Sequence, residues 1–267
     1  MKKKRIVPLV LFRSGYVVQS HNFGKHRKLG LLDGTLKRLE EWGADEIVVL
    51  NISDTELASS EDGRSDLASD FQFDFVSALE ANAKLCSIPL TIGGGIRDFE
   101  YAAQLFNAGA DKLLVNSLYH LDKSVVSNLI DSFGSQAVVL GVDFKVSNNG
   151  YEVWFNRGKE LSTMSLSQLV KDAESLGVGE IFLNSIDRDG MKTGLDLDVL
   201  NYFSNPMVPV IICGGVGNEE QLCEGLAVKG VDGVAAANYF QHIENSLPLA
   251  RKSALEKGML VRRVFPE

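Results

Sequence analysis

The sequence contains few cysteines. Among its 267 residues are three, Cys86, Cys213 and Cys223, which are far apart and odd in number. This argues against a disulfide framework and favours small buried side chains in a reducing compartment. Cys213 precedes a glycine and could suggest a nucleophile, but no histidine lies near it in the sequence, and packing within a strand explains it better.

Basic residues are outnumbered by acidic ones. The 27 Lys and Arg residues face 35 Asp and Glu residues, which gives a formal net charge of −8. The only basic cluster is Lys2–Arg5, at the start of the sequence. An acidic surface argues against nucleic acid as a partner.

Long hydrophobic runs are also missing. Pro8, Arg13 and Ser14 interrupt the apolar residues after Lys2–Arg5, so no segment of signal length follows. No run is long enough to cross a membrane. We therefore expect a cytoplasmic protein without membrane contact. The hydrophobic content of 45% and the 25 glycines favour one large α/β domain over residues 1–267.

One stretch, Ile88–Asn116, has the pattern of a βαβ unit. An apolar run is followed by Gly93–Gly95, an amphipathic run over Arg97–Asn107 and a second apolar run over Lys112–Val115. Glycines between a strand and a helix let backbone N–H groups approach an anion, and the helix N-terminus adds partial positive charge. The loop therefore suggests a phosphate site, although a tight βα turn needs glycine in any case.

This stretch is part of an internal duplication. Three pairs of segments correspond: Ile6–Gly15 with Ala137–Val146, Gly43–Ile52 with Gly177–Ile186, and Ile88–Asn116 with Val208–Asn238. Because the order of the segments is the same in both halves, the pattern predicts a fold built from two similar halves.

The remaining periodicity predicts alternating strands and helices. Strands are expected at Arg5–Phe12, Glu46–Ile52, Ile88–Ile92, Lys112–Val115, Ala137–Phe144 and Glu180–Ser185, with two more inside 208–238. Other helices are expected at Leu31–Trp42, Phe71–Lys84, Lys123–Phe133, Leu166–Leu176, Leu197–Phe203 and Ile243–Lys257. Loops are expected at Arg13–Leu29 and Ser53–Ser69, and a hairpin at Val146–Arg157 with Asn149-Gly150 as its turn.

Eight such βα units predict a (β/α)₈ barrel with a two-fold duplication. In these barrels the chemistry lies at the carboxyl ends of the strands. The polar residues expected there are Asn51, Asn116, Asp143, Asn184, Asp187, Asp189 and Asn238.

The run GEIFLNSIDRDGMKTG (Gly179–Gly194), together with TIGGGI, GADKLLVN, FGSQAVV and CGGVG, resembles the cyclase subunit of imidazole glycerol phosphate synthase. The resemblance extends from Arg5 to about Phe240. It implies a barrel with two phosphate sites that receives ammonia from a partner glutaminase. In that family the products are imidazole glycerol phosphate, for histidine synthesis, and an aminoimidazole ribotide.

The family uses two aspartates as acid and base, because ring closure needs proton transfers on both sides of the ring. Asp143 matches the aspartate of strand 5, but Leu11 stands where the aspartate of strand 1 should be. A leucine can neither take nor give a proton, which argues against intrinsic cyclase activity. Other departures from the family pattern are Gln19, Asn51, Asn184 and Asn238.

Other features of the family are kept. The resemblance implies an ammonia gate formed by Arg5, Glu46, Lys112 and Glu180, although strand-end charges taken singly are often only solvated. It implies phosphate binding by Gly94, Gly95, Asn116, Gly190, Gly214, Gly215 and Asn238. Asp111 matches an aspartate of the glutaminase interface. We expect neither a cofactor nor a metal ion.

A kept gate and a lost aspartate resemble the cyclase-like paralogues of surface-polysaccharide (O-antigen) gene clusters. Those work with a glutaminase-like subunit and a sugar amidotransferase, and the ammonia converts an acetamido sugar to an acetamidino sugar. The main alternative is an active cyclase, with Asp187 or Asp189 as the replacement acid, although such aspartates often only bond loop backbone. A third is a regulatory barrel that binds a phosphorylated sugar.

Overall fold

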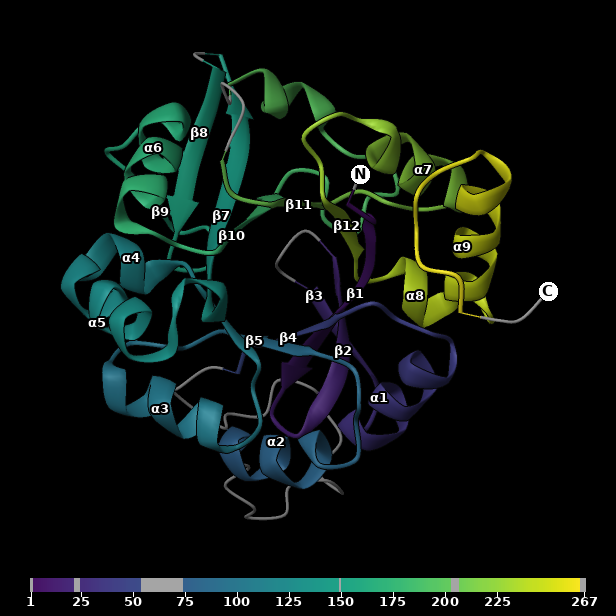
Figure 1. Cartoon of the computed structure of the whole chain (residues 1–267), viewed down its shortest axis with the longest axis horizontal. Coiled ribbons are helices and arrows are strands. Elements are labelled where there is room, and N and C mark those ends of the chain that lie inside the picture. Colours follow the sequence, from purple (N-terminus) through teal and green to yellow (C-terminus); the bar gives the residue numbers. More distant parts are fainter. Residues whose placement is uncertain (1, 22–24, 54–73, 149, 203–206, 265–267) are drawn as a thin grey trace.

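The computed structural model describes residues 2–21, 25–53, 74–148, 150–202 and 207–264. Eight parallel strands form a closed ring with helices around it (Figure 1). The ring consists of β1 (Arg5–Arg13), β4 (Ile47–Asn51), β5 (Leu90–Gly93), β6 (Lys112–Val115), β7 (Val138–Ser147), β10 (Glu180–Ser185), β11 (Val210–Cys213) and β12 (Gly233–Ala236). This confirms the predicted (β/α)₈ barrel.

The ring closes because β1 pairs in parallel with both the second strand and the last. Leu9 is opposite Val48 of β4, and Arg5 is opposite Gly233 of β12. The two halves join again where β6 pairs in parallel with β7, and β7 pairs in parallel with β10 inside the second half. All eight strands therefore begin at one end of the barrel, and their carboxyl ends meet at the other.

The helices form the outer layer (Figure 1). They are α1 (Leu32–Glu41), α2 (Phe75–Ala83), α3 (Phe99–Asn107), α4 (Ser117–Leu121), α5 (Lys123–Phe133), α6 (Leu166–Leu176), α7 (Glu219–Ala227), α8 (Tyr239–His242) and α9 (Ser246–Glu256), with short 3₁₀ turns η2 (Ser135–Ala137) and η3 (Leu197–Tyr202). None of the described helices is long and apolar enough to span a membrane.

Two corresponding helices begin in the same way. The side chain of Asp98 accepts a hydrogen bond from the backbone N–H of Tyr101 at the start of α3, and Asn218 accepts one from Gln221 at the start of α7. Such N-caps satisfy a donor that the helix itself leaves unpaired. These N-caps set the residue at which the helix begins after each glycine loop. The two halves are therefore alike in this local hydrogen bonding as well as in sequence.

Each half also carries antiparallel strands after its first barrel strand. β1 continues into a hairpin with β2 (Tyr16–His21) and β3 (Lys25–Gly30), and β7 continues into β8 (Gly150–Phe155) and β9 (Glu160–Leu161). The second hairpin agrees with the prediction for Val146–Arg157, although Asn149 lies outside the described residues. The β2–β3 hairpin shows that the loop expected over Arg13–Leu29 is wrong. The polar composition of this segment suggested a loop, but its backbone forms strands by pairing with β1 and within the hairpin.

Two other segments differ from expectation. The helix expected at Leu197–Phe203 is a 3₁₀ turn that ends at Tyr202, and Phe203 lies outside the described residues. Helix α2 starts at Phe75, after its N-cap Asp74. Most of the loop expected at Ser53–Ser69, and the first residues of the helix expected from Phe71, also lie outside the described residues.

The hydrophobic core has two parts. A large outer part fills the space between the strands and the helices. A smaller inner part fills the lumen of the barrel; its members are Val7, Leu9, Leu11, Val18, Val48, Leu114, Val139, Phe182, Ile211, Cys213 and Ala235. Alternation along each strand divides its side chains between the two parts. The lumen is therefore an apolar layer with polar residues at its two ends.

Candidate functional site

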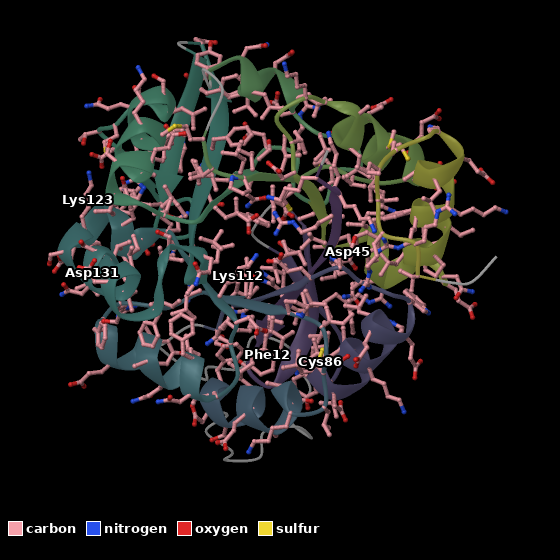
Figure 2. The ribbon with its side chains drawn as sticks, in the orientation of Figure 1. Phe12, Asp45, Cys86, Lys112, Lys123 and Asp131 are labelled. Atoms are coloured by element: carbon pink, nitrogen blue, oxygen red, sulfur yellow. The ribbon has the colours of Figure 1, made fainter. Side chains whose placement is uncertain are left out.

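The amino-terminal end of the lumen holds a ring of four charged side chains. Arg5, Lys112 and Glu180 are the first residues of β1, β6 and β10, and Glu46 directly precedes β4. Because parallel strands begin at the same end of the barrel, these residues lie together. Figure 2 shows Lys112 toward the centre of the barrel.

Each cation in the ring contacts both carboxylates. Arg5 Nη1 lies 2.7 Å from Glu46 Oε2, and Arg5 Nη2 bonds Glu180. Lys112 Nζ lies 3.0 Å from Glu46 Oε2 and 3.0 Å from Glu180 Oε2. The side chains of Glu46 and Glu180 are only 3% and 5% exposed, so the two negative charges are buried against two positive ones.

The ring keeps the carboxylate of Glu46 ionised. Burial alone would raise the pKa of Glu46, but Lys112 and Arg5 outweigh burial, and the pKa is lowered. Thr91 of β5 contributes as well, since its hydroxyl donates to Glu46 Oε1 at 2.5 Å. The sequence analysis missed Thr91, although strand alternation places it on the lumen side, two residues before Gly93.

The carboxyl end of the lumen holds one carboxylate with two amide donors. Asn116 Nδ2 donates to Asp143 Oδ2 at 2.9 Å, and Asn184 Nδ2 donates to Asp143 Oδ1 at 2.8 Å. Burial raises the pKa of Asp143 to about 6; the hydrogen bonds from the two amides oppose this rise, and the nearby negative charge of Asp189 adds to it. Both carboxylate oxygens are thus already hydrogen-bonded within the protein.

Replacing Asp143 with asparagine is expected to stabilise the protein at neutral pH. A carboxyl whose folded-state pKa is raised favours the folded state while it is protonated, and this contribution is lost as the pH rises from about 4 to about 6. Asp143→Asn removes that loss, worth about 2–3 kcal/mol above pH 7. Asn116 Oδ1, which is buried without a partner, can accept from the new amide after its own amide rotates.

Urea unfolding of both proteins between pH 4 and pH 8 checks this expectation. The difference in unfolding free energy should be small near pH 4 and should grow up to about pH 6–7. An equal difference at every pH would show that Asp143 does not carry the shifted pKa.

The missing acid of strand 1 is replaced by an apolar contact. Leu11 is 9% exposed and is paired with Val18 of the β2–β3 hairpin. Both belong to the inner core, and Tyr16, Leu50 and Ile52 pack against it. On this side of the lumen, opposite Asp143, the described residues provide no second carboxylate.

In each of the two glycine loops, one glycine is required because the backbone of a neighbouring strand lies too close for a side chain. A Cβ at Gly94, which has a φ of +90°, would lie 2.0 Å from the carbonyl oxygen of Asn51. In the other half, a Cβ at Gly214, with a φ of +100°, would lie 2.7 Å from the carbonyl oxygen of Ser185. Only glycine fits these positions, so they do not by themselves indicate phosphate.

The next glycine distinguishes the loops. A Cβ at Gly95 would meet no atom of the described residues within 4 Å, whereas one at Gly215 would lie 2.2 Å from the carbonyl oxygen of Gly194. That carbonyl belongs to a neighbouring loop, and the N–H of Gly194 donates to Gly215 at 2.9 Å. Among the described residues, nothing covers the first loop beside Gly95, whereas the backbone of Gly194 covers the second loop beside Gly215.

The residues predicted for the second phosphate site do lie together. They line a cavity of about 20 Å³, formed by Asp189, Gly190, Lys192, Cys213, Gly214, Gly215, Val216, Ala236, Ala237 and Asn238. This is room for about one water molecule. The amide of Asn238 donates to the backbone oxygen of Ser20 at 2.8 Å. Lys192, the cation in this lining, was not predicted from the sequence.

Sulfate soaked into crystals is expected to bind beside Gly95 and not beside Gly215. The first loop is open and leads to the N-terminus of α3, whereas the second cavity is small and is also lined by Asp189. Electron density from soaked and unsoaked crystals gives the comparison. Sulfate beside Gly215 alone would contradict the expectation.

Asp187 and Asp189 hold loops in place. Asp187 Oδ2 accepts from the backbone N–H of Val146 at 2.8 Å, which ties it to the end of β7. Asp189 Oδ2 accepts from the hydroxyl of Ser20 at 3.0 Å. These bonds hold both side chains in place, and the charge of Asp189 also raises the pKa of Asp143, so Asp189 lies near that carboxyl.

Asp111 has a structural role that recurs in the barrel. Its Oδ2 accepts from the backbone N–H of Leu90 at 2.8 Å, and Asp232 does the same for Val210 at 3.1 Å in the other half. Each aspartate directly precedes one barrel strand and hydrogen-bonds the first residue of the adjacent strand, β5 or β11. Asp111 is nevertheless exposed, so its outer side is accessible to a partner.

Comparison with known proteins identifies the family. A family model described as histidine biosynthesis protein matches residues 5–245. A Vibrio vulnificus (strain YJ016) protein, provisionally named imidazole glycerol phosphate synthase subunit hisF2, is 34% identical over 261 residues, which cover 97% of this chain and 91% of that protein. The imidazole glycerol phosphate synthase subunit HisF of Pyrobaculum aerophilum is 35% identical over 261 residues, which cover 97% and 98%. The chain therefore belongs to the histidine biosynthesis protein family, as a HisF-like barrel of the imidazole glycerol phosphate synthase group.

Proposed function

We propose that this chain is the barrel subunit of a glutamine amidotransferase complex. It receives ammonia from a glutaminase docked at the amino-terminal end of the barrel and conducts it through the lumen without cyclising a substrate. The ammonia is used by a sugar amidotransferase that forms an acetamidino sugar for surface polysaccharide. One observation carries this proposal: the charged ring at the amino-terminal end is complete, while at the carboxyl end the apolar Leu11 occupies the position of the strand 1 acid.

The ring supports a polar entrance. Desolvating two carboxylates and two cations costs several kcal/mol per ion, and well-packed apolar side chains of similar volume are often at least as stable. Stability alone therefore does not explain why Arg5, Glu46, Lys112 and Glu180 are all present. The four ion pairs close the ring in this structure, so passage of ammonia requires at least one of them to separate.

The interior of the barrel suits a neutral molecule. Beyond the ring, the inner core consists of aliphatic side chains, Cys213 and Phe182. An ammonium ion would lose its hydration there, whereas uncharged ammonia loses far less. At the other end Asp143 and its two amide partners provide polar groups. The lumen thus favours ammonia over ammonium.

A second candidate function, cyclisation for histidine synthesis, is favoured by one observation. Asp143 is present at the end of β7 with a pKa near 6, a suitable value for a general acid or base at neutral pH. The name of the Pyrobaculum relative points the same way. Leu11, paired with Val18, counts against it, because an apolar side chain occupies the position of the strand 1 acid.

Replacing Asp111 with lysine is expected to weaken binding of the glutaminase subunit at least tenfold. A lysine places a positive charge on the exposed face beside the ring, where we propose that the partner docks. Calorimetric titration of the glutaminase from the same organism measures the affinity. Asp232→Lys is the matched control, because it removes the equivalent backbone hydrogen bond in the other half.

Thermal unfolding of both variants completes this test. If Asp111→Lys and Asp232→Lys lose the same stability and the same affinity, the loss comes from the strand start and Asp111 is no interface residue. Wild-type affinity in the Asp111→Lys protein would likewise contradict docking at this position. If the wild-type chain does not bind the glutaminase, the proposed function is wrong.

A further inference from the structure

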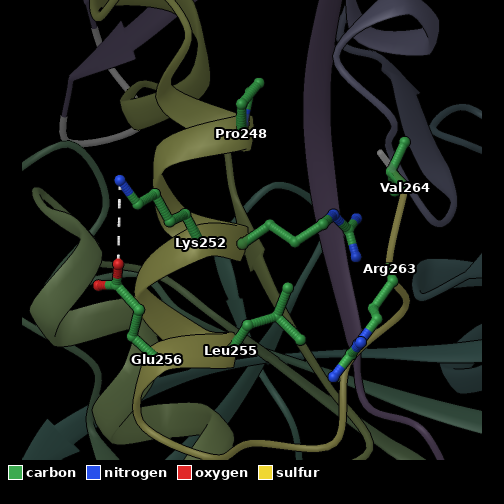
Figure 3. Close-up of a pocket in the computed structure, with 7 residues that line it drawn as sticks. Pro248, Lys252, Leu255, Glu256, Arg263 and Val264 are labelled. Carbon is green, nitrogen blue, oxygen red and sulfur yellow. Dashed lines mark ion pairs between the residues drawn. The ribbon is translucent and has the colours of Figure 1, made fainter. Parts of the chain in front are cut away.

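A cavity of about 350 Å³ lies between α9 and the C-terminal segment, but its positive side chains are already engaged. Lys252 pairs with Glu256 at 3.9 Å on the same helix (Figure 3), and Arg251 pairs with Asp45 at 3.0 Å. The cavity therefore gives no basis for a ligand site. Another part of the surface, the β2–β3 hairpin, carries positive charge that is not neutralised in this way.

The hairpin is basic in an acidic chain. Residues 13–31 contain four Lys and Arg residues and no Asp or Glu, whereas the whole chain has a net charge of −8. Arg27 and Lys28 of β3 are exposed, and neither forms an ion pair with any residue that the structure describes. Lys28 instead lies over the ring of Tyr16, 4.5 Å from its centroid. The outer strand of the hairpin therefore presents positive charge to the solvent.

The outer edge of β3 is unpaired among the described residues. β3 pairs only with β2, and no other backbone–backbone hydrogen bond joins Lys25–Gly30 to a described segment. In an antiparallel pair, part of the N–H and C=O groups of each strand point away from its partner, so such an edge can take up a further strand. Charged side chains protect an edge against unspecific pairing, and here they leave it open only to a segment of opposite charge.

The hairpin is already fixed at the carboxyl end of the lumen. The hydroxyl of Ser20 in β2 donates to Asp189 at 3.0 Å, and its backbone oxygen accepts from the amide of Asn238 at 2.8 Å. Asp189 and Asn238 lie in the loops after β10 and β12, and Val18 of β2 belongs to the inner core. A partner would not need to order this hairpin, which reduces the cost of binding.

We propose that the ammonia-accepting enzyme docks on the β2–β3 hairpin and adds an extended acidic segment to the edge of β3. This inference rests on the proposed function, because it takes the sugar amidotransferase of that complex as the partner. Ammonia that leaves the lumen has to enter the acceptor before it reaches the solvent, so the acceptor sits at the carboxyl end. There the charges of Arg27 and Lys28 select an acidic segment and repel a basic one. Leu29, which is 37% exposed, adds an apolar contact.

Hydrogen exchange followed by mass spectrometry tests the addition of a strand. Exchange in Lys25–Gly30 should slow by about tenfold when the sugar amidotransferase joins the barrel and the glutaminase, because the outer N–H groups gain acceptors. The glutaminase alone should leave this segment unchanged. Unchanged exchange in a mixture that forms product from glutamine would overturn the inference. Slow exchange along this edge in the isolated chain would also overturn it, since the edge would then be covered by the chain itself or by a second copy.

Two charge reversals locate the docking surface. Arg27→Glu should weaken binding of the amidotransferase by about tenfold in calorimetric titration and lower product formation from glutamine, while product formation from added ammonium stays the same. Lys37→Glu is the matched control, because it makes the same change of charge on the exposed side of α1. Both positions are exposed, so both variants should fold.

The outcomes separate the inference from the proposed function. Equal amidotransferase affinity in the Arg27→Glu and Lys37→Glu proteins would overturn docking on the hairpin and leave the proposed function standing. If the three wild-type proteins form product from ammonium but none from glutamine, the proposed function itself is wrong.

Discussion

With ammonium and the ribulosyl-imine substrate of the histidine pathway, the isolated chain is expected to turn over about 10²–10⁴-fold more slowly than a cyclase with two acidic groups. Loss of one positioned acid or base typically costs this factor. The structure adds a reason, because Leu11 and Val18 fill the place opposite Asp143 with apolar groups. A spectrophotometric assay beside a histidine-pathway cyclase measures the ratio.

Two variants separate the missing acid from other effects. Leu11→Asp should restore only a small part of the rate, since it places a carboxylate in the contact with Val18, and Gln19 still departs from the family pattern. Leu11→Asn is the matched control, because it introduces a polar group that cannot exchange a proton. Wild-type turnover similar to that of the reference enzyme would disprove the conduit proposal and favour the cyclase.

Replacing Glu180 with alanine is expected to lower the unfolding free energy by about 3–5 kcal/mol. The substitution leaves Arg5 and Lys112 with one carboxylate between them, and breaking a buried ion pair typically costs this much. Glu80→Ala is the control, since its pair with Lys84 is exposed and should contribute about 0–1 kcal/mol. Urea unfolding at pH 7 gives both values.

A double variant tests whether the ring acts as a unit. Lys112→Met combined with Glu180→Ala removes one charge of each sign. The double variant should therefore lose less unfolding free energy than the sum of the losses in the two single variants. Simple additivity would show that the ion pairs are not coupled.

In complex with the glutaminase, Glu180→Ala should leave glutamine hydrolysis intact while ammonia escapes to the solvent. Unchanged transfer of ammonia to the acceptor would contradict the gate.

The same ring shows how much of the site could be predicted from sequence. Arg5, Glu46, Lys112 and Glu180 directly precede or begin apolar runs that read as strands. In a closed parallel barrel, all strand starts lie at one end, so the fold alone brings these residues together. Thr91 escaped the prediction because a threonine within an apolar strand carries no signal of its hydrogen bond to Glu46.

At the other end of the barrel the sequence was less informative. It identified Asp143 and the leucine that replaces its partner, but not that Asn116 and Asn184 occupy both oxygens of Asp143. It matched Gly95 and Gly215 as equivalents, whereas the structure leaves one open and covers the other. Contacts of this kind join residues far apart in the chain, and local composition does not report them.

The sequence by itself determined the barrel and its duplication, because the alternation of apolar runs and glycine turns is local and occurs in both halves. Only the tertiary structure decided that 25–30 forms a strand, since that polar segment gains its hydrogen bonds by pairing with β2. It also decided that Arg251 and Arg262 attach the C-terminal segment to Gly43 and Asp45. Those contacts exist only once α9 and the segment after it lie against the residues that precede β4.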